Sequence, residues 1–164
     1  MKARQPHCRV FAIFDYNLSI MSYTYEYPRP CVSVDCIIFR KADEDTEVLL
    51  IKRLNPPYQD KWALPGGFID MDETLEESAR RELREETGLT GIDLRQLHAF
   101  GDPGRDPRAR VVTVTYYGFT TKENSDAKGA DDAKEAAWFK VDLLPELAFD
   151  HDQMIAMALE RARV

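Results

Sequence analysis

Three glutamates crowd one side of a predicted helix. Glu82, Glu85 and Glu86 lie in the run RELREE at 81–86, and at about 100° per residue they fall within an arc of roughly 100°. Like charges at this spacing repel, so a purely structural helix would gain by spreading them. A hard cation such as Mg²⁺ reverses that cost, because carboxylate oxygens are its preferred protein ligands and substrate phosphates complete its shell. The alternative is an ordinary solvated Glu-rich helix face.

The helix that must position these carboxylates is predicted over residues 75–87. Thr74 and Glu77 form a capping-box pattern at its start, and Gly88 suits the left-handed position past its end. Apolar residues recur every four positions and would anchor the helix on the core beside its acidic face (Leu75, Ala79 and Leu83). One face of the helix can therefore pack on the core while the adjacent face presents carboxylate ligands to a metal ion.

The other predicted elements favour an α/β fold. Runs of β-branched and apolar residues predict strands at 31–39, 48–51, 92–100, 110–121 and 136–141, of which the first two form a hairpin. A second helix closes the chain, with Asp150 and Gln153 as its capping residues. Polar loops are predicted at 101–108 and 122–132. A mixed sheet flanked by two helices is the economical architecture.

Length and charge exclude several classes of protein. The chain has 164 residues, about one domain's length, and no apolar run nears the ~20 residues of a membrane span. An excess of 29 Asp and Glu over 22 Lys and Arg gives a net charge of −7, which disfavours loose binding to nucleic acid or anionic lipid. The 3 cysteines have neither disulfide density nor zinc spacing. We expect a cytoplasmic protein with neither nucleic acid nor membrane as a partner.

The sequence pattern of the N-terminal residues differs from that of the rest of the chain. Residues 1–22 are interpreted as an N-terminal extension, with Met21 as a candidate alternative start, and 23–164 as a single domain. Tyr23, Tyr25 and Tyr27 alternate, which places three rings on one face of an extended segment. Those rings would pack on a strand, stack on a nucleobase or contribute to a homodimer interface.

The full spacing around the acidic run identifies a motif. Residues 67–89 follow the pattern G-x5-E-x7-REL-x-EE-x-GL, which matches every position of the Nudix box, and the chain resembles the Nudix hydrolase family. The preceding segment 64–67 (LPGG) and the flanking strands also look like that family's α/β/α sandwich with a mixed central sheet. The resemblance covers roughly residues 28–164.

The resemblance implies a loop-helix-loop that holds divalent cations against a diphosphate. Glu82 and Glu86 would be the principal metal ligands, Glu85 would share a further cation, and the Gly66 carbonyl would add one oxygen. Mg²⁺ is the expected cofactor, with Mn²⁺ as the alternative. Glycines at positions 66 and 67 let the backbone approach the site without an intervening side chain, and Gly67 is counted with the supporting residues.

The resemblance also assigns supporting and catalytic roles. Arg81 would pair with Glu73 and set the geometry of the cluster, with Gly88 ending the helix. The general base would be Glu82 or Glu85 inside the box, or Glu135 on a later loop, where a solvated charge is the equal alternative. Weaker loop candidates are three further acids (Glu123, Asp131 and Asp132).

Substrate contacts are assigned from outside the box. The segments 100–108 and 110–114 resemble an ADP-ribose pyrophosphatase branch of the family. Arg105 and Arg108 could bind phosphate through paired hydrogen bonds, although solvated loop arginines are commoner. Arg53 and Tyr27 are further candidate substrate contacts. Two aromatic residues near the glycines and two histidines are interpreted as structural (Trp62, Phe68, His98 and His151).

The predicted reaction is hydrolysis of a nucleoside diphosphate linked to another group, with ADP-ribose giving AMP and ribose 5-phosphate. One rival is a pyrophosphatase acting on oxidised nucleoside triphosphates, whose box would look the same. The other is a non-catalytic sensor of ADP-ribose or nucleotide sugars, a class that regulates transcription through an appended winged helix. The complete set of box carboxylates, and the absence of such a module before Val164, favour the enzyme.

Overall fold

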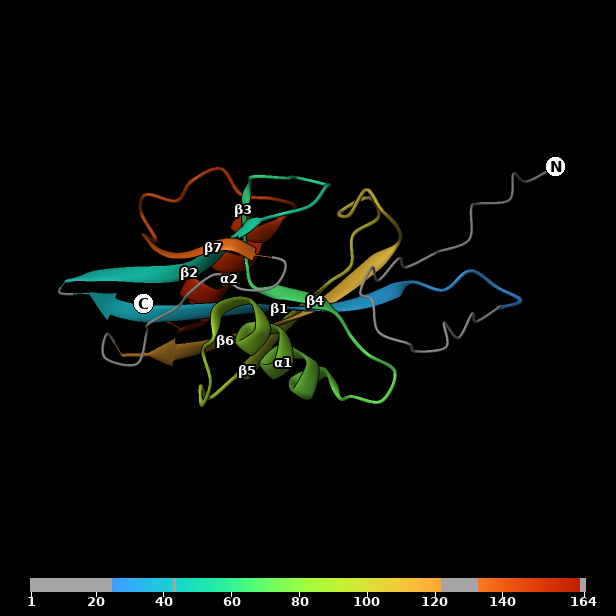
Figure 1. Cartoon of the computed structure of the whole chain (residues 1–164), viewed down its shortest axis with the longest axis horizontal. Coiled ribbons are helices and arrows are strands. Elements are labelled where there is room, and N and C mark those ends of the chain that lie inside the picture. The colour runs from blue at the N-terminus through green and yellow to red at the C-terminus, as the bar shows by residue number, and fades with distance from the viewer. Residues whose placement is uncertain (1–24, 43, 122–132, 163–164) are drawn as a thin grey trace.

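A mixed β-sheet forms the central layer of the protein (Figure 1). The computed structural model describes residues 25–42, 44–121 and 133–162. Within them lie the strands β1 (Cys31–Ala42), β2 (Asp45–Arg53), β3 (Trp62–Ala63), β4 (Gly66–Phe68), β5 (Arg95–Phe100), β6 (Val111–Thr120) and β7 (Ala133–Lys140). The two helices are α1 (Leu75–Thr87) and α2 (His151–Ala162).

The strand order explains why the sheet is mixed. Its main path runs β3-β2-β1-β6-β5, while β4 pairs with β1 and β7 with β2. Only β1 and β6 pair in parallel among these strands of the described chain, and every other pairing is antiparallel. The predicted hairpin of the first two strands is confirmed, as is the predicted mixed sheet with two helices.

The central strand β1 is buried on both of its faces. Val34, Cys36 and Ile38 pack with α1 in one hydrophobic cluster, whereas Ile37 and Phe39 pack with α2 in another. Because successive side chains of a strand point to opposite faces, this alternation places the two helices on opposite sides of the sheet, as Figure 1 shows. The arrangement is the α/β/α sandwich that was predicted.

The helix α1 begins and ends where the sequence predicts. Thr74 Oγ1 accepts a hydrogen bond from the backbone N–H of Glu77, whose own side chain accepts one from the N–H of Thr74. Gly88 adopts a left-handed conformation with φ of 75° and donates its N–H to the carbonyl of Arg84. The capping box and the glycine therefore fix both ends of the helix that carries the acidic run.

The predicted strands differ from the structure at their ends, and the two hairpin strands are longer than predicted, extending to Ala42 and from Asp45 to Arg53. The strand expected from residue 92 begins only at Arg95, because Ile92 and Leu94 are buried on the α1 cluster while the chain is still turning after Gly91. The strand expected at 136–141 begins earlier, at Ala133. Its hydrogen bonding to β2 extends through polar positions that carry no apolar pattern.

The remaining predictions concern the rest of the chain. The N-terminal extension at 1–22 and the polar loop at 122–132 lie outside the described residues, so the assignment of 23–164 as the domain stays a prediction. Neither of the described helices is long and apolar enough to cross a membrane.

Candidate active site

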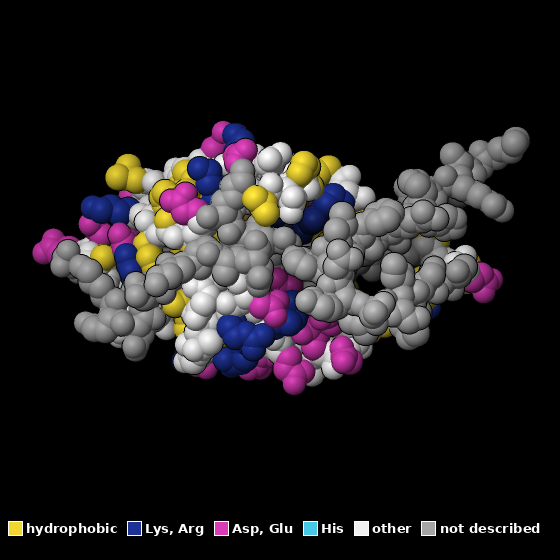
Figure 2. Space-filling model, in the orientation of Figure 1, with side chains coloured by type: hydrophobic (Ala, Val, Ile, Leu, Met, Phe, Trp, Pro, Cys, Tyr) yellow, Lys and Arg dark blue, Asp and Glu magenta, His cyan; other side chains and the backbone are white. Residues whose placement is uncertain are grey.

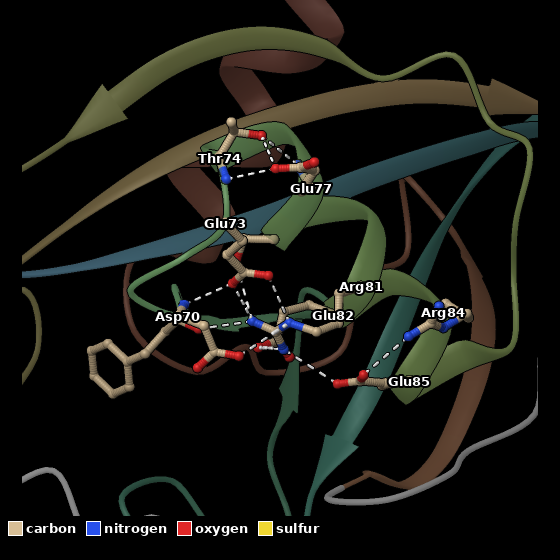
Figure 3. Close-up of polar contacts among 10 residues, drawn as sticks. Asp70, Glu73, Thr74, Glu77, Arg81, Glu82, Arg84 and Glu85 are labelled. Atoms are coloured by element: carbon tan, nitrogen blue, oxygen red, sulfur yellow. Dashed lines mark hydrogen bonds and ion pairs between the residues drawn. The ribbon is translucent and has the colours of Figure 1, made fainter. Parts of the chain in front are cut away.

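Arg81 is the centre of the ionic network on α1 (Figure 3). Its guanidinium donates to both carboxylate oxygens of Glu73, at 2.9 and 2.6 Å. It also donates to Glu82 at 2.7 Å, to Glu85 at 3.2 Å and to the carbonyl of Phe68 at 3.2 Å. The structure therefore contains the pairing of Arg81 with Glu73 that the family resemblance implied.

This network sets the charge state of its members. Hydrogen bonds from Arg81 hold the pKa of Glu73 down at about 2, and the same bonds raise the pKa of the guanidinium. Burial raises the pKa of Glu82, with the hydrogen bond from Arg81 acting in the opposite direction. Basic side chains lie directly beside acidic ones on the surface over α1 (Figure 2).

Glu86 is the most buried carboxylate of the cluster. Its side chain points to β4, where one oxygen accepts a hydrogen bond from the Gly66 N–H at 2.8 Å, and the residue is only 8% exposed. Burial, followed by the charges of Glu82 and Asp35, raises its pKa to about 8. The site thus contains a carboxyl group that keeps its proton near neutral pH, because the charge of Arg53 offsets the effect of burial only in part.

The metal-free stability should consequently depend on pH. Between the ordinary pKa near 4.5 and the folded value near 8, the folded state keeps the Glu86 proton that the unfolded state loses. The contribution of Glu86 to the free energy of unfolding is complete below pH 4.5. It falls by about 1.4 kcal/mol per pH unit as the pH rises from there to about 8. We expect urea unfolding in EDTA to show this fall most clearly between pH 6.5 and 8, because below pH 6.5 the lowered pKa of buried His151 adds a slope of opposite sign. Glu86→Gln should flatten it, and an equal slope in that variant would contradict the assignment.

The two glycines of β4 are required by close contacts. A Cβ on Gly66 would lie 2.2 Å from the carbonyl oxygen of Val34, and one on Gly67 would lie 2.4 Å from a carboxylate oxygen of Glu82. The first contact is with backbone, which cannot move aside. The second is with the end of a side chain that the family resemblance assigns to the metal.

Gly67→Ala should therefore impair the site more than the fold. The added methyl group displaces the Glu82 carboxylate, and we expect turnover to fall roughly 10- to 100-fold, with the melting temperature reduced by only a few degrees. Steady-state kinetics and thermal melts on one preparation measure both. Gly101→Ala, where an added Cβ would make only contacts of 3.4 Å or more with Val112 and φ lies outside the left-handed region, controls for the effect of replacing a glycine. Full turnover in Gly67→Ala would show that Glu82 can move freely.

The carboxylates do not form a closed metal cage. Within the described part of the chain, no three His, Cys, Asp or Glu side chains are gathered closely enough to hold an ion. Arg81 binds Glu82 and Glu85, and so competes for the oxygens that a cation would take. The donor set still fits a hard divalent cation, because it contains only oxygens and includes the buried Glu86, whose raised pKa a bound cation would lower. Glu82, Glu85, Glu86 and the Gly66 carbonyl therefore remain the predicted ligands.

A small pocket of about 70 Å³ opens on the α2 side of the β4 glycines. Asp35 of β1 lies in its wall and is 8% exposed. One of its oxygens accepts a hydrogen bond from Thr113 Oγ1 at 2.6 Å, and the other lies 3.7 Å from Nε2 of His151. His151 Nδ1 accepts from the Leu64 N–H at 2.9 Å, which keeps the imidazole in a fixed orientation, and the residue, predicted to be structural, also lies in the pocket wall.

Sequence reasoning missed Asp35 as a site residue. A single acid inside the otherwise apolar strand 31–39 was the available signal, since a buried carboxylate is costly unless a partner or ligand compensates it. Phe68 was predicted to be core, but it lies in the pocket wall with the guanidinium carbon of Arg108 5.1 Å from its ring centre.

Three predicted substrate contacts lie in the wall of this pocket. Arg105 forms a two-point ion pair with Asp150, at 2.9 and 2.6 Å, so its donors are largely engaged. Arg108 pairs with Asp106 but keeps 42% of its side chain exposed. Arg53 donates to backbone carbonyls, and burial and the charge of Arg108 lower its pKa.

Two predicted residues lie apart from the pocket wall. Glu135, predicted to be on a loop, is instead an exposed residue of β7 paired with Lys52 of β2. Tyr27 is 71% exposed. Asp150, predicted to cap α2, uses its carboxylate to bind Arg105. The weaker acidic candidates all lie outside the described residues (Glu123, Asp131 and Asp132).

Comparison with known proteins agrees with the fold and with the carboxylate helix. The family model described as the NUDIX domain matches residues 29–158. An ADP-ribose pyrophosphatase of Methanocaldococcus jannaschii is 43% identical over 79% of this chain and 73% of its own length. The ADPR responsive transcriptional repressor NtrR of Acinetobacter baylyi is 35% identical over 83% of this chain, but this covers only 56% of the repressor.

Solved structures that resemble this chain belong to the same family. The NUDIX domain of Shewanella oneidensis NrtR, crystallised with ADP ribose, superposes with a TM-score of 0.77 at 34% identity, covering 83% of this chain and 90% of that domain. A MutT/nudix family protein from Enterococcus faecalis gives the same TM-score at 35% identity, covering 87% of this chain and 65% of its own. The chain therefore belongs to the Nudix family, and it is a Nudix hydrolase.

Proposed function

We propose that the protein hydrolyses the diphosphate of ADP-ribose to AMP and ribose 5-phosphate, with Mg²⁺ as the cofactor and Mn²⁺ as the alternative. The observation that carries this proposal is the 43% identity to an ADP-ribose pyrophosphatase over 79% of the chain. The unbroken set of carboxylates on α1 supports turnover as well as binding.

The reaction adds one water across the bridge between the two phosphates. The water oxygen bonds to one phosphorus, the bridging P–O bond breaks, and the second phosphate leaves with that electron pair. A bound divalent cation supplies charge neutralisation at the phosphates and a lowered pKa for the attacking water. The carboxylates of Glu82, Glu85 and Glu86 would hold the cation, and Arg81 orients the carboxylates that it contacts.

A carboxylate must accept the proton of the water. Glu82 and Glu85 both lie on the metal-binding face, whereas Glu135 lies in β7, exposed and opposite Lys52. We therefore favour a base inside the box over Glu135.

Glu135→Gln tests that choice. Because its side chain is exposed and its strand position is defined by backbone pairing, we expect turnover within about twofold of the parent enzyme and an unchanged pH profile. Initial rates from pH 6 to 10 provide the measurement. A loss beyond about a hundredfold, the range in which general bases act, would instead place Glu135 in the mechanism.

The proposed activity is tested with a substrate panel at fixed Mg²⁺. ADP-ribose, other nucleoside diphosphate derivatives, and normal and oxidised nucleoside triphosphates are compared by kcat/KM, with product identification by mass spectrometry. We expect the highest value for ADP-ribose. Preference for a triphosphate would favour the sanitising alternative, and tight binding of ADP-ribose without products would favour the sensor.

Three further properties belong to this proposal. We propose a cytoplasmic location, consistent with the buried thiol of Cys36, and a homodimer that uses the Tyr-rich segment near Tyr27. Absence of nucleic-acid binding is supported by the net charge of −7, although one structure of S. oneidensis NrtR contains a 27mer DNA. Light scattering tests the dimer, and fluorescence polarisation with a labelled duplex tests the binding of DNA.

A further inference from the structure

Phe149 has an unusual backbone conformation at the edge of the pocket. It immediately precedes α2 and has φ of 55°, in the left-handed region that a bulky side chain rarely adopts. Such a conformation costs on the order of 1–3 kcal/mol and persists only where surrounding structure imposes it. The ion pair of neighbouring Asp150 with Arg105 holds this turn, and Phe149 lies in the pocket wall.

The Phe149 ring is supported from behind and covered by cations. Tyr58 packs edge-on against it with ring centres 4.7 Å apart, and His151 lies 5.3 Å away. The guanidinium carbons of Arg53 and Arg108 lie 5.0 and 5.5 Å from its centre. The ring therefore has a fixed position and presents an electron-rich surface to planar groups.

A second ring lies near the same guanidinium. Phe68, directly after the β4 glycines, has its centre 5.1 Å from the guanidinium carbon of Arg108. Arg108 thus contacts Phe68 and Phe149, which we name the aromatic slot. Its side chain is 42% exposed, and its ion pair with Asp106 is the only salt bridge it makes to a described residue. Arg108 is not part of the hydrophobic clusters, but its departure would have to preserve its ion pair with Asp106, whose side chain is only 2% exposed.

We propose that the aromatic slot of Phe68 and Phe149 holds the planar base of the nucleotide, and that Arg108 occupies it when no nucleotide is bound. The proposal rests on the proposed function, which makes the ligand a nucleoside diphosphate derivative. A guanidinium and a nucleobase are both flat groups that stack on aromatic faces. The terminal ribose is less suited, because ring faces offer its hydroxyls no strong hydrogen-bond partners.

The test compares the two halves of the substrate. AMP and ribose 5-phosphate each carry one phosphate, and only AMP carries a base. We expect Phe149→Leu to raise the Kd for AMP about tenfold or more, the range of base–aromatic stacking, and to leave the Kd for ribose 5-phosphate within about twofold. Calorimetry with Mg²⁺ present measures both constants. Phe149→Tyr, which keeps the ring, should restore AMP affinity.

A matched control and a second wall variant complete the experiment. Phe139→Leu removes a partly buried ring that packs on Trp62, away from the pocket, and should change neither constant. If Phe149→Leu does not fold, Phe68→Leu provides the same measurement. In turnover of ADP-ribose, either slot variant should raise KM while kcat stays within about threefold.

The outcomes separate this inference from the proposed function. An equal loss of affinity for AMP and ribose 5-phosphate would overturn the proposal that the slot binds the base. A loss of affinity for ribose 5-phosphate alone would do the same. Retained AMP affinity in both Phe149→Leu and Phe68→Leu also overturns it. AMP binding needs no turnover, so failure of the substrate panel to show ADP-ribose hydrolysis overturns the proposed function without affecting this measurement.

Discussion

Replacing Glu86 by glutamine is expected to reduce turnover by roughly a thousandfold, since it removes a ligand charge that helps to stabilise the transition state by several kcal/mol. Glutamine has nearly the same shape, and its side-chain oxygen can still accept the hydrogen bond from the Gly66 N–H. The fold should therefore survive while the charge is lost. Steady-state rates across a titration of Mg²⁺ and Mn²⁺ measure the effect.

Glu76→Gln is the matched control for this variant. Glu76 lies on the same helix, 56% exposed in its side chain and paired only with Arg80 among the described salt bridges. Its replacement should leave kcat and the metal dependence unchanged. Turnover of Glu86→Gln above about a tenth of the parent value at saturating metal would remove Glu86 from the principal ligands.

Arg81→Gln is expected to have the second largest effect, acting on activity and stability together. Loss of the guanidinium leaves Glu73, Glu82 and Glu85 without their shared partner. We expect kcat to fall roughly 10- to 100-fold, as for residues that orient metal ligands. The free energy of unfolding should fall by about 1–3 kcal/mol, the cost of losing charged hydrogen bonds. Kinetics and urea unfolding measure the two effects.

The control for this variant lies three residues further along the helix. Arg84 makes one described ion pair, with Glu85, and its side chain is 59% exposed, so Arg84→Gln should change unfolding by less than about 0.5 kcal/mol. Arg81→Lys should remain impaired, because one ammonium cannot reproduce the paired hydrogen bonds to Glu73. Full activity in Arg81→Lys would show that only the charge is needed.

The α1 helix was predictable because its signals are local. Thr74, Glu77 and Gly88 act within one turn of the helix ends, so their effects do not depend on the rest of the fold. The partnership of Arg81 with Glu73 was available only through the family resemblance. Spacing in the sequence alone does not show that the chain before the helix folds back onto it.

The pocket was less predictable because its contacts join distant parts of the chain. Arg105 and Asp150 are 45 positions apart, and no local pattern links them. Phe68 has the composition of a core residue, and only the turn after the β4 glycines directs it into the pocket wall. Glu135 lies on a strand because backbone hydrogen bonds to β2 extend past the apolar run.

The alternation along β1 makes this strand less tolerant of length changes than of substitutions that conserve side-chain volume. Its register with β6 extends over ten residue pairs, from Cys31 with Val111 to Arg40 with Thr120. One residue inserted before Asp35 would turn that carboxylate from the pocket into the hydrophobic layer under α1 and turn Cys36 towards α2. Natural variation in this strand should therefore exchange side chains at constant length, while insertions and deletions accumulate in the loops.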